Sequence, residues 1–103
     1  MIDWDRVEEL RIEVGDEDFI EIAGLFLEEL QDAVATLDTL PRDQTLCDAL
    51  HGIKGSAANL GFKAVSELCA LGERDPETFA VTDLRTRMHT SIEALKGRYD
   101  AIP

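Results

Sequence analysis

The chain has 103 residues, of which 45% are hydrophobic and 31% are charged, and its formal net charge is −12. This length suits one compact domain over residues 1–103, and no stretch approaches the roughly 20 apolar residues needed to span a bilayer. The negative charge disfavours binding to nucleic acid or to an anionic membrane surface. We therefore expect a soluble, cytoplasmic, monomeric protein that binds neither.

The apolar residues of the N-terminal half recur at helical spacing. A short helix is expected after Asp3, a suitable N-cap, and Gly15 ends it. A second helix is expected over residues 17–40, capped by Asp16 and stopped by Pro41. Its inward stripe steps by three or four residues through Phe19, Ile22, Phe26, Leu30, Val34 and Leu37.

The C-terminal half predicts three more helices. Asp43 can cap the first, and Gly61 follows it as a left-handed cap. The next spans residues 63–73, and the last spans residues 82–99 after a break at Pro76. Their inward stripes are Leu46, Leu50, Ile53, Ala57 and Leu60; Val65, Leu68 and Leu71; and Leu84, Met88, Ile92, Leu95 and Tyr99. Helices joined by short connections pack antiparallel, so we expect an all-α, up-down four-helix bundle with a short additional N-terminal helix.

The stretch from His51 to Gly61 is the most informative for function. On a helical wheel, His51 points well over 90° away from the apolar stripe. Lys54 and Gly55 follow one turn later on the same side, and Ala58 lies two turns on. The imidazole is thus expected to be surrounded by small residues that leave space around it, and to lie beside one ammonium group.

This arrangement suits phosphoryl transfer. A neutral imidazole is a good nucleophile near pH 7. Lys54 offers a point charge to phosphoryl oxygens, while Gly55 leaves room for a close approach. The second ring nitrogen needs a partner, and Glu73 is our candidate, although it also fits a solvated surface acid. No ATP-binding motif is present, so we expect a phosphocarrier without a cofactor of its own, whose partner supplies Mg²⁺ and much of the catalysis.

A docking surface is expected around His51. Asp48 is one turn before it, and Ala58 shares its face. Asn59 and Phe62 are placed at the rim of this surface, with packing of Phe62 into the core as the alternative.

At these residues the sequence resembles the histidine-containing phosphotransfer (HPt) domain family, through an H-x-x-K-G core, small residues and a Leu-Gly pair. The matching residues are His51, Lys54, Gly55, Ser56, Ala57, Leu60 and Gly61. The resemblance implies that His51 is phosphorylated, that Lys54 is its electrostatic partner, and that Gly55 gives steric clearance. It also implies that Glu73, 22 residues on, bonds the ring. The implied partner is an aspartate-bearing response-regulator receiver domain, free or within a hybrid sensor kinase, in a multistep phosphorelay.

Three other interpretations remain open at this stage. Cys47 and His51 are four residues apart and could ligate a metal, with Cys69 or His89 adding ligands. Otherwise the two cysteines fit partly buried thiols in a reducing compartment. The chain could also be a binding module that never carries phosphate, or the phosphorylated domain of a chemotaxis-type kinase.

Overall fold

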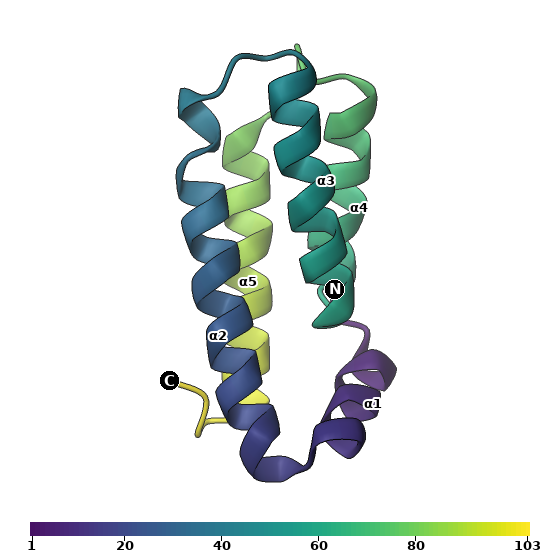
Figure 1. Ribbon diagram of the computed structural model, residues 1–103, viewed down its shortest axis with the longest axis vertical. Coiled ribbons are helices and arrows are strands. Elements are labelled where there is room, and N and C mark those ends of the chain that lie inside the picture. Colours follow the sequence, from purple (N-terminus) through teal and green to yellow (C-terminus); the bar gives the residue numbers. More distant parts are fainter.

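The computed structural model describes residues 1–103 and is entirely helical apart from its turns. The elements in chain order are α1 (Trp4–Val14), α2 (Asp16–Ala35), the 3-10 helix η1 (Leu37–Thr39), α3 (Gln44–Asn59), α4 (Lys63–Arg74) and α5 (Val81–Arg98). Helices α2 to α5 lie side by side and alternate in direction, and α1 lies at one end of them (Figure 1). The expected all-α bundle with an additional N-terminal helix is confirmed.

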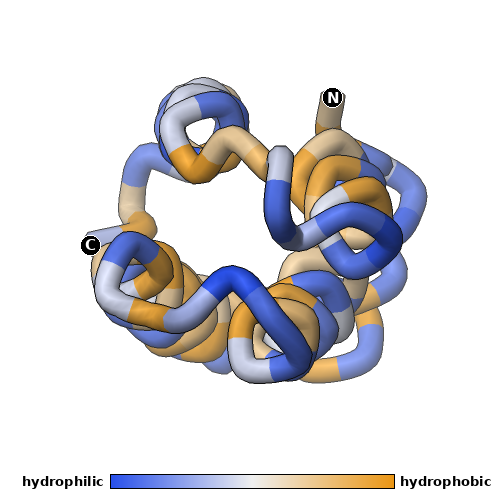
Figure 2. Tube along the Cα trace, turned by 90° about the horizontal axis from the view of Figure 1, so that it is seen from above, coloured by the Kyte–Doolittle hydropathy of each residue, from blue (hydrophilic) through white to orange (hydrophobic).

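The bundle core is built mainly from the inward stripes of α2 to α5. All five predicted stripe residues of α3 are buried, and so are Leu84, Met88, Ile92 and Leu95 of α5. Figure 2 looks down the bundle and shows the helices surrounding a shared interior. Each fully buried leucine contributes about 1.5–3 kcal/mol relative to an exposed one. No helix combines the length and the hydrophobicity that crossing a membrane requires.

Helix α1 is fastened to the connection between α3 and α4. Asp3 caps α1 by accepting a hydrogen bond from the backbone N–H of Arg6, as predicted, and its own N–H donates to the carbonyl of Gly61 at 2.7 Å. Gly61 has a φ of +83°, and a Cβ there would lie 2.8 Å from the carbonyl oxygen of Asp3. Only glycine combines this conformation with so close an approach. The end of α3 is therefore held in a fixed position.

Three predictions about α2 are wrong, namely its N-cap, its end and part of its inward stripe. Gly15, not Asp16, is the N-cap, and Asp16 instead pairs with Arg11 at 2.6 Å. The helix ends at Ala35 because the chain tightens into η1, where the hydroxyl of Thr39 donates to the carbonyl of Thr36. The side chains buried along this segment are Phe19, Ala23, Leu27, Leu30, Val34 and Leu37, whereas Ile22 and Phe26 are only half-buried.

Helix α4 has the predicted position but a different rotation. The structure buries Val65, Cys69 and Gly72, leaves Leu68 half-buried and exposes 55% of Leu71. A Cβ on Gly72 would lie 2.6 Å from Leu50 Cδ1. The glycine thus lets α4 approach the core closely, and this contact outweighs burial of the two leucines.

Candidate functional site

His51 lies midway along α3 and projects into solvent. Its side chain is 73% exposed, while its neighbours Leu50 and Ile53 are buried. The buried stripe of α3 therefore fixes the orientation of the helix and places the imidazole on the opposite side, as the helical wheel predicts. The ring is open to a reacting partner.

Glu73 connects His51 to Lys54. One carboxylate oxygen, Oε1, lies 2.8 Å from Nδ1 of His51. The other, Oε2, accepts a hydrogen bond from the ammonium of Lys54 at 2.5 Å. Glu73 is on the last turn of α4, so this carboxylate joins two neighbouring helices at the site. The sequence prediction that Glu73 reaches His51 agrees with this geometry.

The contact with Glu73 sets the tautomer of His51. An ionised carboxylate only accepts hydrogen bonds, so Nδ1 must carry the proton and donate it. In a neutral imidazole the other nitrogen, Nε2, then carries the lone pair. Nε2 is therefore the nucleophilic atom of the ring.

The carboxylate of Glu73 remains ionised well below neutral pH. The hydrogen bond from Lys54 lowers the pKa of Glu73 most, and the hydrogen bond and charge of His51 lower it further. Lys54 is held on the α4 side of His51, and its own carbonyl accepts a hydrogen bond from the hydroxyl of Ser66. The carboxylate of Glu73 thus contacts both the ammonium of Lys54 and the imidazole of His51.

Two glycines of α3 leave bare helix surface beside the imidazole. A Cβ built on Gly52 or on Gly55 would meet no other atom within 4 Å. Neither glycine has a positive φ, so the fold itself does not require them. Each costs about 1 kcal/mol relative to alanine inside a helix. The clearance predicted for Gly55 is present, and Gly52 extends it.

Three of the four residues predicted to contact a partner are exposed, namely Asp48, Ala58 and Asn59. The fourth, Phe62, is 0% exposed, so its assignment to the docking surface is wrong. Phe62 follows Gly61 at the turn between α3 and α4, where its ring can pack into the core. The carbonyl of Asn59 also accepts a hydrogen bond from Arg6, which links the rim of the surface to α1.

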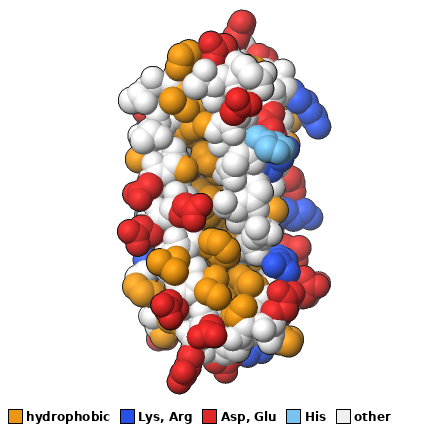
Figure 3. All heavy atoms as spheres, viewed as in Figure 1, with side chains coloured by type: hydrophobic (Ala, Val, Ile, Leu, Met, Phe, Trp, Pro, Cys, Tyr) orange, Lys and Arg blue, Asp and Glu red, His pale blue; other side chains and the backbone are white.

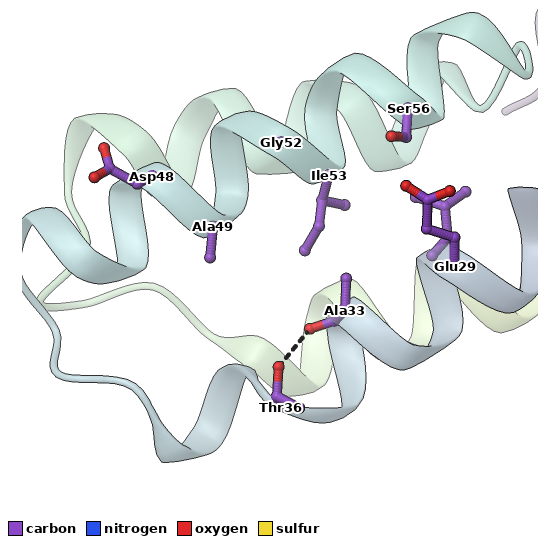
Figure 4. Close-up of a pocket in the computed structure, with 9 residues that line it drawn as sticks. Glu29, Ala33, Thr36, Asp48, Ala49, Gly52, Ile53 and Ser56 are labelled. Carbon is purple, nitrogen blue, oxygen red and sulfur yellow. Dashed lines mark hydrogen bonds between the residues drawn. The ribbon is translucent and has the colours of Figure 1, made fainter.

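A groove between α2 and α3 adjoins this face, and the sequence did not reveal it. Its volume is about 360 Å³. It is lined by Glu29, Leu30 and Ala33 of α2, by Thr36 at the C-cap of that helix, and by Asp48, Ala49, Gly52, Ile53 and Ser56 of α3 (Figure 4). In the space-filling view, apolar side chains follow the boundary between the two helices, and a histidine lies on the same side of the molecule, to the right of that boundary (Figure 3).

The residues considered for a metal site do not converge. The thiol of Cys47 donates to the backbone carbonyl of Glu73 at 3.4 Å. Cys69 is buried, and burial raises the pKa of its thiol to about 12. His89 pairs with Glu93 on α5. No group of three or more His, Cys, Asp or Glu side chains is placed to hold a metal ion.

One comparison with known proteins identifies a family for this chain. The family model described as the Hpt domain matches residues 21–98, which include all of α3, α4 and α5 and most of α2. No solved structure matches the chain. The matched region contains His51, Lys54, Gly55 and Glu73. The chain therefore belongs to the Hpt domain family, the histidine phosphotransfer modules of phosphorelays.

Proposed function

We propose that this chain carries a phosphoryl group on Nε2 of His51 and exchanges it with an aspartate of response-regulator receiver domains. The receiver can be a free response regulator or part of a hybrid sensor kinase. The observation that carries the proposal is the contact of Nδ1 with Glu73, which leaves Nε2 as the nucleophile of a ring that is 73% exposed.

In the proposed reaction, the lone pair of Nε2 forms a bond to phosphorus as the bond between phosphorus and the aspartyl oxygen breaks. The aspartate leaves as a carboxylate, and Nδ1 of His51 keeps its proton. The imidazole gains positive charge in this step, and the carboxylate of Glu73 stabilises that charge through its existing hydrogen bond. The reverse step returns the phosphoryl group to an aspartate.

Lys54 has two roles in this scheme. Its ammonium offsets the charge of Glu73 in the resting site, where the two groups are 2.5 Å apart. Because it lies one helical turn from His51, it also favours the incoming phosphoryl dianion. The receiver domain supplies the second reactant and the Mg²⁺ that balances the remaining charge.

The proposal is tested by incubating the chain with a receiver domain phosphorylated by acetyl phosphate. We expect acid-labile, alkali-stable phosphate on His51, and none on a folded His51→Gln variant. His89→Gln is the matched control and should be labelled like the native chain. The His89 side chain is 75% exposed, but it lies on α5, away from the site, and pairs there with Glu93. Equal labelling of the native chain and His51→Gln would contradict the proposal.

A further inference from the structure

The groove between α2 and α3 has an apolar floor with a carboxylate on each wall. Ala33, Ala49 and Ile53 contribute to the apolar lining, while Glu29 belongs to α2 and Asp48 to α3 (Figure 4). This combination suits an apolar side chain in the groove with cations on either side.

Neither carboxylate has a cation of its own. Glu29 takes part in no ion pair, and Asp48 accepts only a neutral hydrogen bond, from the side-chain amide of Gln44 at 2.8 Å. The nearby ammonium of Lys54 is bound to Glu73 on the other side of His51. A partner that covers the groove without supplying cations would leave two charges unpaired, which is costly.

The groove borders the surface of α3 that carries His51. Gly52 lines the groove and is next to His51 in sequence. Gly55 lies one turn on, and a side chain would find open space at both glycines. A partner large enough to place an aspartate at Nε2 can therefore pass over this bare surface and cover the groove as well.

We infer that Glu29 and Asp48 determine which receivers this chain serves, by selecting those with Lys or Arg beside an apolar side chain near the phosphorylated aspartate. This inference rests on the proposed phosphotransfer function. The two carboxylates attract a basic surface and disfavour an acidic one. They act on the docking of the receiver.

The test uses one receiver domain in three forms, unmodified, with two lysines, or with two glutamates introduced around its phosphorylation pocket. Each form is phosphorylated by acetyl phosphate and mixed with the full chain at low and at high NaCl concentration. We expect the lysine form to transfer phosphate fastest and the glutamate form slowest. This preference should shrink at high salt because the charges are exposed.

Variants of the chain assign the effect to the groove. Glu29→Gln and Asp48→Asn should each slow transfer from the lysine form by about two- to fivefold, the range expected for one exposed charge pair. Glu28→Gln and Asp100→Asn remove the same charge from exposed residues outside the groove lining and should have no such effect. Equal slowing by the groove variants and the control variants would overturn the inference. So would a difference in transfer rate between the lysine and glutamate forms that does not change with NaCl concentration.

Two further measurements separate the possible failures. Direct phosphorylation by phosphoramidate needs no docking, so it should label His51 equally in the native chain, in Glu29→Gln and in the two control variants. If neither phosphoramidate nor any receiver labels His51, both the proposed function and this inference fail. A dimer in sedimentation that Glu29→Gln or Asp48→Asn dissociates would show that a second copy occupies the groove, and would overturn the inference alone.

Discussion

Nδ1 of His51 lies 2.8 Å from Oε1 of Glu73, although the two residues are 22 positions apart and belong to different helices. The contact depends on the rotation of α4. The rotation that buries Cys69 and Gly72 turns Glu73 toward α3 and leaves Leu71 exposed. The fold thus accepts an exposed leucine while a carboxylate orients the imidazole.

Replacing Glu73 should separate its hydrogen bond from its charge. Glu73→Gln keeps an oxygen that can accept from Nδ1 of His51 but loses the charge, so we expect a modest reduction in phosphotransfer rate. Glu73→Ala removes the acceptor and should slow transfer about tenfold, the value of one oriented hydrogen bond. Stopped-flow transfer from a phosphorylated receiver measures both. If the two variants behave alike, orientation of the ring is not what Glu73 provides.

A larger side chain in the open space at Gly55 should raise the stability of the fold and lower the rate of phosphotransfer. Gly55→Gln places a good helix former in open space, so we expect the free energy of unfolding to rise by about 0.5–1 kcal/mol. Transfer from a receiver should nevertheless slow, because the new side chain obstructs docking. Gly97→Gln is the matched control, since Gly97 also lies in open helix surface, on α5. It should gain stability without losing transfer, and a comparable loss there would contradict the docking role.

Gly61→Ala should loosen α1. The new Cβ meets the backbone carbonyl of Asp3 at 2.8 Å, in a φ region that alanine avoids. We expect a loss of about 1–3 kcal/mol in the free energy of unfolding. The single tryptophan, Trp4, packs against Arg98 and is a reporter of α1, so its fluorescence should shift to the red. An unchanged spectrum and melting temperature would show that α1 is not fastened at Gly61.

The attachment of α1 to α5 should weaken in acid. Hydrogen bonds from Arg11 and then from Tyr99 lower the pKa of Glu8 from 4.5 to about 2. A carboxyl with a lowered pKa in the folded state contributes stability above its unfolded pKa and loses it as the pH falls. Glu8→Gln should therefore be less stable than the native chain at pH 7, and the gap should close between pH 4.5 and about 2. Thermal melts across this range measure it.

Glu21→Gln is the control for that titration, because Glu21 is exposed and forms no ion pair. Its stability relative to the native chain should not follow the same curve. A gap for Glu8→Gln that stays constant down to pH 2 would contradict the assigned hydrogen bonds.

The arrangement of α3 could be predicted from sequence because its stripe is regular. The apolar residues step by four and three along one face, and Asp43 and Gly61 mark its ends, so the direction of His51 followed from helical geometry alone. Lys54 and Gly55 then followed from their spacing. The local sequence pattern was sufficient to place these three side chains because their directions depend on α3 alone and not on how a neighbouring helix packs.

The rotation of α4 about its own axis could not be predicted in the same way. Leucine is more apolar than glycine, so the pattern favoured burial of Leu71, whereas close packing over Gly72 decided the outcome. For Phe62 the sequence left the rim and the core both open, and the structure buries it directly after Gly61. The groove beside Ala33 needs two helices to exist, and no single segment encodes it.

The most direct test of the account is nuclear magnetic resonance of the chain labelled with ¹⁵N in its histidine rings and phosphorylated by a receiver. The account predicts one-bond coupling of ³¹P to Nε2 of His51, with the proton retained on Nδ1 facing Glu73. Coupling to Nδ1, or phosphate on His89 alone, would contradict it.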